Sequence, residues 1–155
     1  MMHKILTIVT LLFALNCKTS QTEAKNVEEN IVLIAKGNLY GSGEEDIEAQ
    51  NSIIKSKDVW QGLIDKMYSV NKVSDSFSEI DIDFSKHTII AIFDNVKTTG
   101  GHSLELDVKT NSENIAVNII RKFPKSMVTM VMTQPYHIIK ISKSELPIVF
   151  SRVKN

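Results

Sequence analysis

Residues 103–121 read SLELDVKTNSENIAVNIIR, and the order of apolar and polar side chains in this stretch decides the fold class. Apolar side chains alternate with charged or polar ones on both sides of the polar run Asn111–Asn114 (NSEN). The alternating apolar residues are Leu104, Leu106, Val108, Ile115, Val117 and Ile119. A period of two places such side chains on one face of a strand. We therefore predict a β-hairpin made of strands 103–109 and 115–121.

Apolar segments on either side of the hairpin predict five further strands. These segments are residues 31–35, 87–93, 127–133, 136–142 and 148–150. The run His87–Phe93 (HTIIAIF) is apolar at nearly every position, which is typical of a strand buried on both faces. Val128, Met130 and Met132 would share one face of their strand, as a stripe of core residues. The alternative for the methionines of this segment, Met127 included, is an adaptable binding surface.

One helix is expected, over about residues 57–68. The apolar side chains that recur there at helical spacing are Trp60, Leu63, Ile64, Met67 and Tyr68. Ser56 stands where a helix N-cap is favoured, and Asp58 lies in the first turn, where the helix dipole stabilises a negative charge. The glycine-rich run Gly37–Asp46 (GNLYGSGEED) is interpreted as a loop.

Residues 31–155 are expected to form one domain, because a chain of 155 residues fits a single hydrophobic core. Hydrophobic residues make up 43% of the chain and charged residues 23%, as in ordinary globular proteins. Successive strands joined by short polar loops favour antiparallel pairing. We predict an α+β fold that is β-rich, with about seven mostly antiparallel strands in a sandwich-like arrangement and one packed helix. Lys plus Arg and Asp plus Glu both total 18, without the basic stripe of a nucleic-acid-binding protein, so no nucleic-acid partner is expected.

The N-terminal segment, residues 1–16, predicts a removable signal peptide. Lys4 gives a positive start, and the uncharged run Ile5–Leu15 (ILTIVTLLFAL) follows it. A membrane-spanning helix needs about 20 apolar residues, whereas a signal-peptide core needs about 7–15. Residues 14–17 (ALNC) resemble a bacterial lipobox, in which the cysteine thiol is acylated and the signal is cut before it. Cys17 is the one cysteine of the chain, and lipidation would cap a thiol that is otherwise reactive in an oxidising compartment.

Residues 17–30 are expected to be a lipidated tether between the membrane and the domain. The run 18–30 (KTSQTEAKNVEEN) has one large apolar side chain, Val27, and no periodicity. The expected location is the bacterial cell envelope, as a membrane-anchored lipoprotein that faces the periplasm or the cell surface. The alternative is an ordinary cleaved signal, or an uncleaved anchor, with an incidental cysteine.

Six short motifs follow one another along the chain. They are Ser42-Gly43, a strand leading into Ser56–Trp60 (SKDVW), Ile82–Lys86 (IDFSK), Ile89–Phe93 (IIAIF), Thr99–Gly101 (TGG) and Gln134–Ile141 (QPYHIIKI). Their order and spacing, over about residues 32–150, resemble the PrcB C-terminal domain family, which is named for a protein of a surface protease complex. The resemblance implies a non-catalytic module that associates with or stabilises a protease or another envelope protein.

The first candidate binding loop comprises Thr98, Thr99, Gly100, Gly101 and His102. Its hydroxyl groups, and glycines that let another backbone approach closely, suit insertion into a partner's groove. The loop also resembles the threonine-glycine loop of chagasin-like cysteine protease inhibitors, which makes an inhibitor acting through Thr99-Gly100-Gly101 an alternative function. In a simpler interpretation, Gly100-Gly101 is the turn that joins strand 87–93 to strand 103–109.

The second candidate loop is Pro135-Tyr136-His137. Tyrosine and histidine have an apolar body and a polar tip, which suits a half-exposed ligand lip. The alternative is core packing at the start of a strand, with Pro135 fixing the loop.

No catalytic residues, cofactor or metal site are expected. The chain lacks the GxSxG, HExxH, CxxC, GxxxxGK and EF-hand patterns. The alternative from another functional class is a hydrolase that uses His87, His102 or His137 with nearby carboxylates.

Two groups of acidic residues have a structural and a functional interpretation. Glu44, Glu45, Asp46 and Glu48 lie in one segment, as a solvated loop or as oxygen ligands for calcium. Asp81 and Asp83 would share a face as paired carboxylates. The family resemblance instead implies a structural entry into the central strand, with Asp83 bonding backbone amides in a turn.

The lipobox makes a direct prediction about the mature protein. Mass spectrometry of the native N-terminus should find a chain that begins at a lipidated Cys17. A chain that retains Met1, or a free thiol at Cys17, would contradict the prediction.

Overall fold

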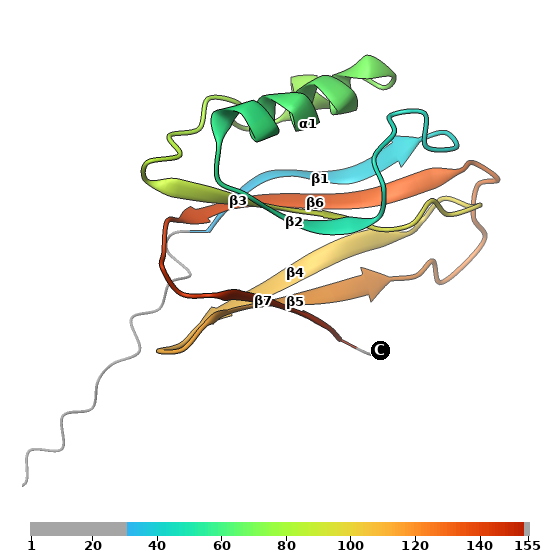
Figure 1. Ribbon diagram of the computed structural model, residues 1–155. Helices are drawn as coiled ribbons and strands as arrows, with labels where there is room; N and C mark the ends of the chain where they lie inside the picture. The colour runs from blue at the N-terminus through green and yellow to red at the C-terminus, as the bar shows by residue number, and fades with distance from the viewer. Residues whose placement is uncertain (1–30, 154–155) are drawn as a thin grey trace, which may run out of the picture.

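Seven strands, one α-helix and one 3-10 turn make up residues 31–153, the part of the chain that the structure, a computed structural model, describes (Figure 1). In chain order they are β1 (Val32–Tyr40), β2 (Gln50–Ile54), α1 (Lys57–Ser69), the 3-10 turn (Val73–Ser76), β3 (His87–Phe93), β4 (Ser103–Thr110), β5 (Ile115–Lys122), β6 (Thr133–Ser142) and β7 (Ile148–Arg152). The predicted signal peptide, Cys17 and the tether lie outside the described residues. Within residues 31–153, no helix is long and apolar enough to cross a membrane.

The strands form two sheets that pack face to face, and α1 covers the outer face of the larger sheet (Figure 1). The four-stranded sheet has the order β1-β6-β3-β2, with every neighbouring pair antiparallel. The three-stranded sheet has the order β4-β5-β7, in which β4–β5 is antiparallel and β5–β7 is parallel. The predicted class, α+β and β-rich with mostly antiparallel strands and one packed helix, is confirmed.

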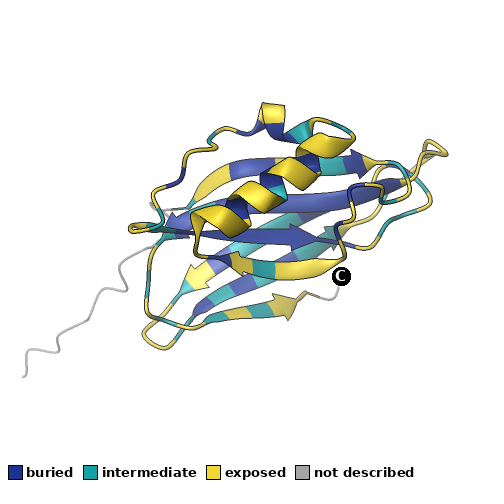
Figure 2. Cartoon of the chain, turned by 45° about the horizontal axis from the view of Figure 1, so that its top comes forward, coloured by how far each residue is buried: buried dark blue, intermediate teal, exposed yellow. Residues whose placement is uncertain are grey.

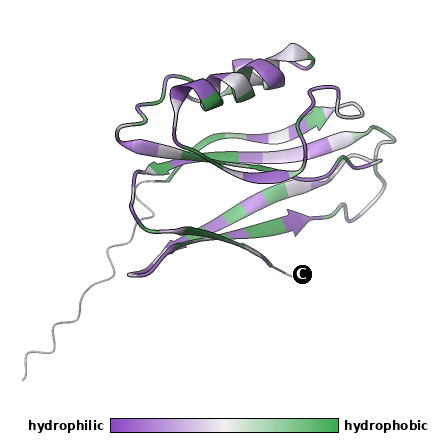
Figure 3. Ribbon diagram, viewed as in Figure 1, coloured by the Kyte–Doolittle hydropathy of each residue, from purple (hydrophilic) through white to green (hydrophobic). Residues whose placement is uncertain are grey.

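The predicted hairpin is also confirmed, as β4 paired with β5. In its turn, the Asn114 carbonyl accepts a hydrogen bond from the Asn111 amide at 3.1 Å. The Asn111 side-chain oxygen accepts bonds from the Glu113 and Asn114 amides, each at 2.8 Å. Hydrophobic and hydrophilic residues alternate along both strands (Figure 3), so the apolar face meets the larger sheet.

β3 and β6, the two middle strands of the four-stranded sheet, are buried on both faces. On the side of α1, their core residues are Ile89, Ala91, Phe93, Tyr136 and Ile138. On the side of the three-stranded sheet, they are Ile90, Ile92, Ile139 and Ile141. Full burial of one such aliphatic side chain stabilises the fold by about 1.5–3 kcal/mol, so these two strands connect the two cores energetically.

The helix packs on the sheet through the face that the sequence predicts. Its buried residues are Trp60, Ile64 and Met67. The Trp60 indole N–H donates a hydrogen bond to the Ile80 carbonyl at 2.8 Å, and the ring stacks on Phe77 at 5.9 Å between centroids. Trp60 thereby attaches the segment that follows the helix. Tyr68 is exposed, and Ser56 occupies the N-cap position without a side-chain cap bond.

The prediction of a loop over all of Gly37–Asp46 is wrong, because β1 continues to Tyr40. Gly37 lies opposite Tyr136 of β6, and a Cβ on Gly37 would lie 3.3 Å from the Tyr136 hydroxyl. The glycine thus serves aromatic packing inside a strand. The loop begins only at Gly41, where φ is +117°.

The predicted strand 127–133 is also wrong, since only Thr133 belongs to a strand. Val128, Met130 and Met132 are exposed and do not form a core stripe. β1 ends at Tyr40, which pairs with Thr133, and β3 ends at Phe93, which pairs with Tyr136, so neither neighbour of β6 extends alongside the segment before Thr133. The seventh strand is instead β2, which leads into Ser56 as in the motif order described above.

Met67 offers a test of how the helix is held. It is fully buried, so Met67→Ala should lower the free energy of unfolding by about 2–5 kcal/mol. Val59 lies on the same helix with 59% of its side chain exposed, and Val59→Ala should change that free energy by less than about 0.5 kcal/mol. Urea denaturation followed by circular dichroism measures both, and equal effects would contradict the packing described.

Candidate functional site

Three connections meet at one end of the sandwich, which we call the loop end (Figure 1). They are the β1–β2 loop (residues 41–49), the β3–β4 loop (94–102) and the β5–β6 loop (123–132). Strand register brings them together, because Tyr40 at the end of β1 pairs with Thr133 at the start of β6. β1 begins at the opposite end of the sheet, where Val32 pairs with Lys140.

The start of β6 connects the three loops through backbone hydrogen bonds. Lys97 and Thr133 each donate an N–H to the other's carbonyl, at 2.7 and 3.0 Å. The Gly41 amide donates to the Met132 carbonyl at 3.1 Å. Each loop is therefore held close to the other two near its base.

Gln134 extends this connection into the interior. It is 2% exposed, and its side-chain amide donates to the carbonyls of Ile47 at 2.8 Å and Asp94 at 3.0 Å. The Asp94 amide in turn donates to the Pro135 carbonyl at 2.9 Å. Hydrogen bonds are electrostatically stronger in a low-dielectric interior, so these bonds make the base of the loop end rigid.

Thr98–His102, the first candidate binding loop, lies partly beneath the β5–β6 loop. Gly100 is buried, and its amide donates to the Thr129 carbonyl at 3.0 Å. A Cβ on Gly100 would collide with the Thr129 side chain. Gly101 has φ +83°, and a Cβ there would lie 2.9 Å from the Pro124 Cβ. Both glycines thus permit close packing of one loop on the other.

The side chains of the same segment make further internal contacts. The Thr99 carbonyl accepts a bond from the Thr133 hydroxyl at 2.9 Å, and the Thr99 hydroxyl lies 3.2 Å from His102 Nε2. The His102 ring packs edge-on against Phe123. The backbone carbonyl of His102 accepts a hydrogen bond from the Asn38 side chain at 3.2 Å. These contacts do not favour insertion of the threonine-glycine segment into a protease cleft.

The β3–β4 loop does join the strands that the simpler interpretation named. However, β3 belongs to the four-stranded sheet and β4 to the three-stranded sheet. The loop is therefore a crossing between sheets, and Gly100-Gly101 lies in the connection that the simpler interpretation predicts.

Pro135-Tyr136-His137, the second candidate, lies inside β6 and is buried, so its alternative interpretation as core packing is confirmed. Tyr136 stacks on Phe93 with centroids 6.1 Å apart, and burial raises the pKa of Tyr136 to about 12. His137 Nδ1 lies 2.9 Å from the Leu104 carbonyl of β4, and burial lowers the pKa of His137. The His137 contact joins the two sheets.

The β5–β6 loop carries large exposed apolar residues, and Figure 2 shows where along the chain exposed residues lie. Met127 is fully exposed, and the exposed fraction is 59% for Phe123 and 87% for Met130. Further exposed apolar residues at this end are Tyr40, Val128, Val131 and Met132. The methionines are the alternative binding surface that the sequence offers, whereas the shared face of Val128, Met130 and Met132 predicts a core stripe.

Asp94 is a buried charge at the base of the β3–β4 loop. Its carboxylate lies 2.9 Å from Lys97 Nζ and 3.2 Å from Arg121 Nε, and 5% of the side chain is exposed. Burial raises the pKa of Asp94, but the Lys97 bond, the Asn95 amide and the charge of Arg121 outweigh burial, so the pKa lies below its usual value. The ionised carboxylate therefore attaches the loop to β5.

Of the four acidic residues in segment 44–48, Glu45 is buried and the other three are exposed. Glu45 is buried and accepts a bond from the Asn71 side chain. Asp46 forms an ion pair with Lys66 of α1 at 3.2 Å. No group of three or more His, Cys, Asp or Glu residues in the described part of the chain is arranged to hold a metal ion.

Asp83 has the structural role that the sequence analysis gave it. Its carboxylate accepts a bond from the Ser85 amide at 3.0 Å and pairs with Lys86 at 3.0 Å. Bonds from the Ser85 hydroxyl and Lys86 lower the pKa of Asp83 to about 2. Asp81 is instead exposed and lies 3.7 Å from Lys57.

Each of the three candidate histidines has a different hydrogen-bond partner. His87 Nδ1 is 3.3 Å from the Asp83 carbonyl, and His102 and His137 have the threonine and carbonyl partners given above. Among residues 31–153, none of these imidazoles is hydrogen-bonded to a carboxylate.

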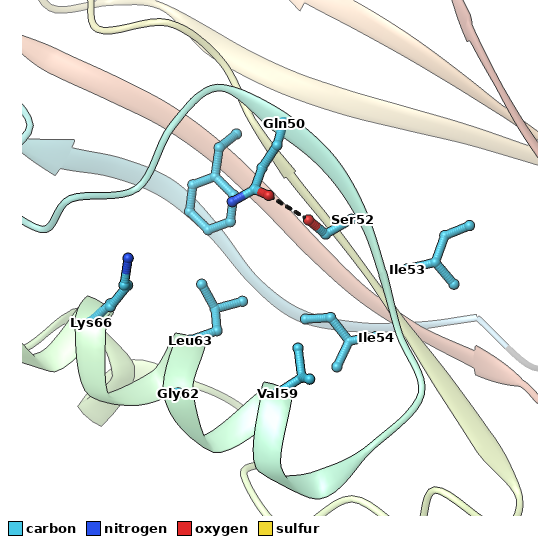
Figure 4. A pocket seen from close by; sticks show the side chains of 9 residues that line it. Gln50, Ser52, Ile53, Ile54, Val59, Gly62, Leu63 and Lys66 are labelled. Carbon is cyan, nitrogen blue, oxygen red and sulfur yellow. Dashed lines mark hydrogen bonds between the residues drawn. The ribbon is translucent and has the colours of Figure 1, made fainter.

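A shallow groove of about 400 Å³ lies between β2 and α1 (Figure 4). Its lining includes the apolar side chains of Ile54, Val59 and Leu63 and the polar side chains of Gln50, Ser52 and Lys66. Ser52 donates a hydrogen bond to Gln50 at 2.9 Å, and Lys66 is engaged with Asp46. The groove lies on the opposite side of the four-stranded sheet from β4 and β5.

Residues 88–142 match the model of a family described as PrcB C-terminal, which confirms the resemblance over that segment. The match covers roughly one third of the chain, from β3 to β6, and includes both the β3–β4 and the β5–β6 loops. No curated protein and no solved structure matches the chain.

The buried Asp94 ion pairs make a prediction about pH. Because the folded-state pKa is lowered from 3.8, the stabilisation is present above that value and is lost as the pH falls through the folded-state pKa. Asp94→Asn leaves Lys97 and Arg121 without their carboxylate and should lower the free energy of unfolding at pH 7 by roughly 3 kcal/mol.

Asp107→Asn is the matched control, because Asp107 is partly exposed and pairs with Lys109 at the surface. Urea titrations of both variants between pH 7 and pH 3 measure the difference. An Asp94→Asn protein as stable as the parent protein at pH 7 would contradict the role of Asp94.

Proposed function

We propose that this chain, in which residues 88–142 match the PrcB C-terminal family, is a membrane-tethered, non-catalytic protein-binding module of the bacterial cell envelope. It is anchored by lipid at Cys17 and associates with a protease or another envelope protein through the loop end. The role of such a module is to hold or stabilise its partner.

The loop end is the observation that carries this proposal. Its three loops are held at their bases by Thr133, Gln134 and Met132. The β5–β6 loop nevertheless exposes large apolar side chains. A surface that is ordered before binding loses little conformational entropy when a partner docks. Functional residues are also disproportionately found on loops held by a rigid scaffold, which describes this end of the sandwich.

The position of the chain's first described residues supports the same arrangement. β1 begins at Val32, and its nine residues span about 30 Å before the loop end is reached. An anchor that precedes residue 31 therefore joins the domain at the end opposite the loops. The loop end then faces away from the point of attachment, where a protein partner has access to it.

Photo-cross-linking in the native bacterium tests the proposal. A diazirine amino acid at position 98, an exposed residue of the loop end, should give one discrete protein adduct in the membrane fraction. The same amino acid at position 113, exposed in the β4–β5 turn at the opposite end, is the matched control and should not give that adduct.

The partner's identity then decides between a protease and another envelope protein, and the purified pair should bind reversibly. Adducts that are absent at position 98, or equally abundant at both positions, would contradict the proposed function.

A further inference from the structure

We infer that the β5–β6 loop, rather than the threonine-glycine segment, is the part that enters the partner, and that the partner presents an apolar pocket rimmed by carboxylates. The inference rests on the proposed function and specifies the chemistry of its binding surface. Met127 and Met130 are the side chains that occupy the pocket. Lys122 and Lys125 face its acidic rim.

Exposure is the first argument. Met127 is fully exposed, Met130 is 87% exposed and Phe123 is 59% exposed. Several large exposed apolar residues on one loop mark an interaction site more often than single scattered ones do. Methionine is enriched in interface cores and adapts its shape to a pocket because its side chain is unbranched and polarizable.

The support beneath the loop is the second argument. Gly100 donates to the Thr129 carbonyl, Gly101 lies against Pro124, and the His102 ring packs on Phe123. The threonine-glycine segment therefore holds the β5–β6 loop from below. Gly100, Gly101 and His102 are positioning residues, and the segment they position carries the exposed apolar side chains.

Charge is the third argument, and it identifies the rim of the partner's pocket. The run 122–132 (KFPKSMVTMVM) contains two lysines and no acidic residue. Lys122 and Lys125 are exposed, and no ion pair with them is found among the described residues. Lys97, by contrast, is already paired with Asp94. Two unpaired cations beside an apolar surface are complemented by carboxylates, which also guide the approach of the partner.

The same observations favour a protein partner for this exposed apolar loop over two others, a second copy of the chain and the lipid bilayer. In a symmetric contact between two copies, the loop would meet its own lysines, and like charges would repel. For the loop end to touch the anchoring bilayer, the tether would have to run back along about 30 Å of the domain. The predicted tether, residues 17–30, extends to about 46 Å at most, so most of its length would lie along the domain.

The test uses the full-length protein in native membranes, with a diazirine amino acid at position 130. We expect a protein adduct with the same partner that position 98 captures. With the photo-reactive group at position 98, Met127→Ser combined with Met130→Ser should reduce that adduct about ten-fold. Lys122→Glu combined with Lys125→Glu should reduce it by a similar factor, and the parent protein's adduct should weaken with added salt.

Two matched controls accompany these variants. Val59→Ser combined with Val149→Ser removes exposed apolar side chains from the helix groove and from β7, and should leave the adduct unchanged. Lys143→Glu reverses an exposed charge at the opposite end and should also have no effect. Because all substituted side chains are exposed, the variants should unfold at the same urea concentration as the parent protein.

The possible outcomes separate the inference from the proposed function. An adduct at position 130 with a lipid, or with a second copy of the chain, overturns the inference by naming a different occupant. An adduct at position 98 that survives the methionine and lysine substitutions overturns the inference and leaves the proposed function standing. The absence of any adduct at positions 98 and 130 overturns both.

Discussion

The start of β6 is the constraint on which the loop end depends. Thr133 forms a two-way backbone bridge with Lys97, and Gln134 bonds two carbonyls in the interior. Pro135 has no N–H to donate, yet its carbonyl accepts the Asp94 amide. β6 itself is fixed because it is buried between two layers and paired on both sides. Three loops that are distant in sequence are thus held by one strand end, and the ionised Asp94 secures the same place electrostatically.

This arrangement divides the loop end into a support and a contact surface. The threonine-glycine segment contributes backbone bonds and close packing, for which its glycines are required. The β5–β6 loop contributes exposed apolar side chains and two lysines. Because β1 begins at the opposite end, the proposed attachment and the proposed binding surface lie a strand length apart. Under the proposed function, one small sandwich would be anchored and engaged with a partner at the same time.

Local patterns were sufficient to predict most of the fold from the sequence. Alternation predicted β4 and β5, the apolar run predicted β3, and the 3.6-residue period predicted α1, since each depends on residues close in sequence. The errors arose where distant residues decide the outcome. Gly37 resembles a loop residue until Tyr136 is known to lie against it. The methionine segment resembles a strand, but β1 and β3, the neighbours of β6, end before they reach it. Likewise, motif and composition located the threonine-glycine segment, but only the packing of Thr129 on Gly100 assigns it a supporting role.

Peroxide footprinting of the methionines tests most directly whether the β5–β6 loop is the binding surface. In the purified protein, Met127 and Met130 should oxidise rapidly because they are exposed, and buried Met67 should oxidise slowly. In intact cells, a partner on the loop should slow the oxidation of Met127 and Met130 several-fold relative to the purified protein, while Met67 remains slow in both. Equal oxidation rates of Met127 and Met130 in the two preparations would contradict the account.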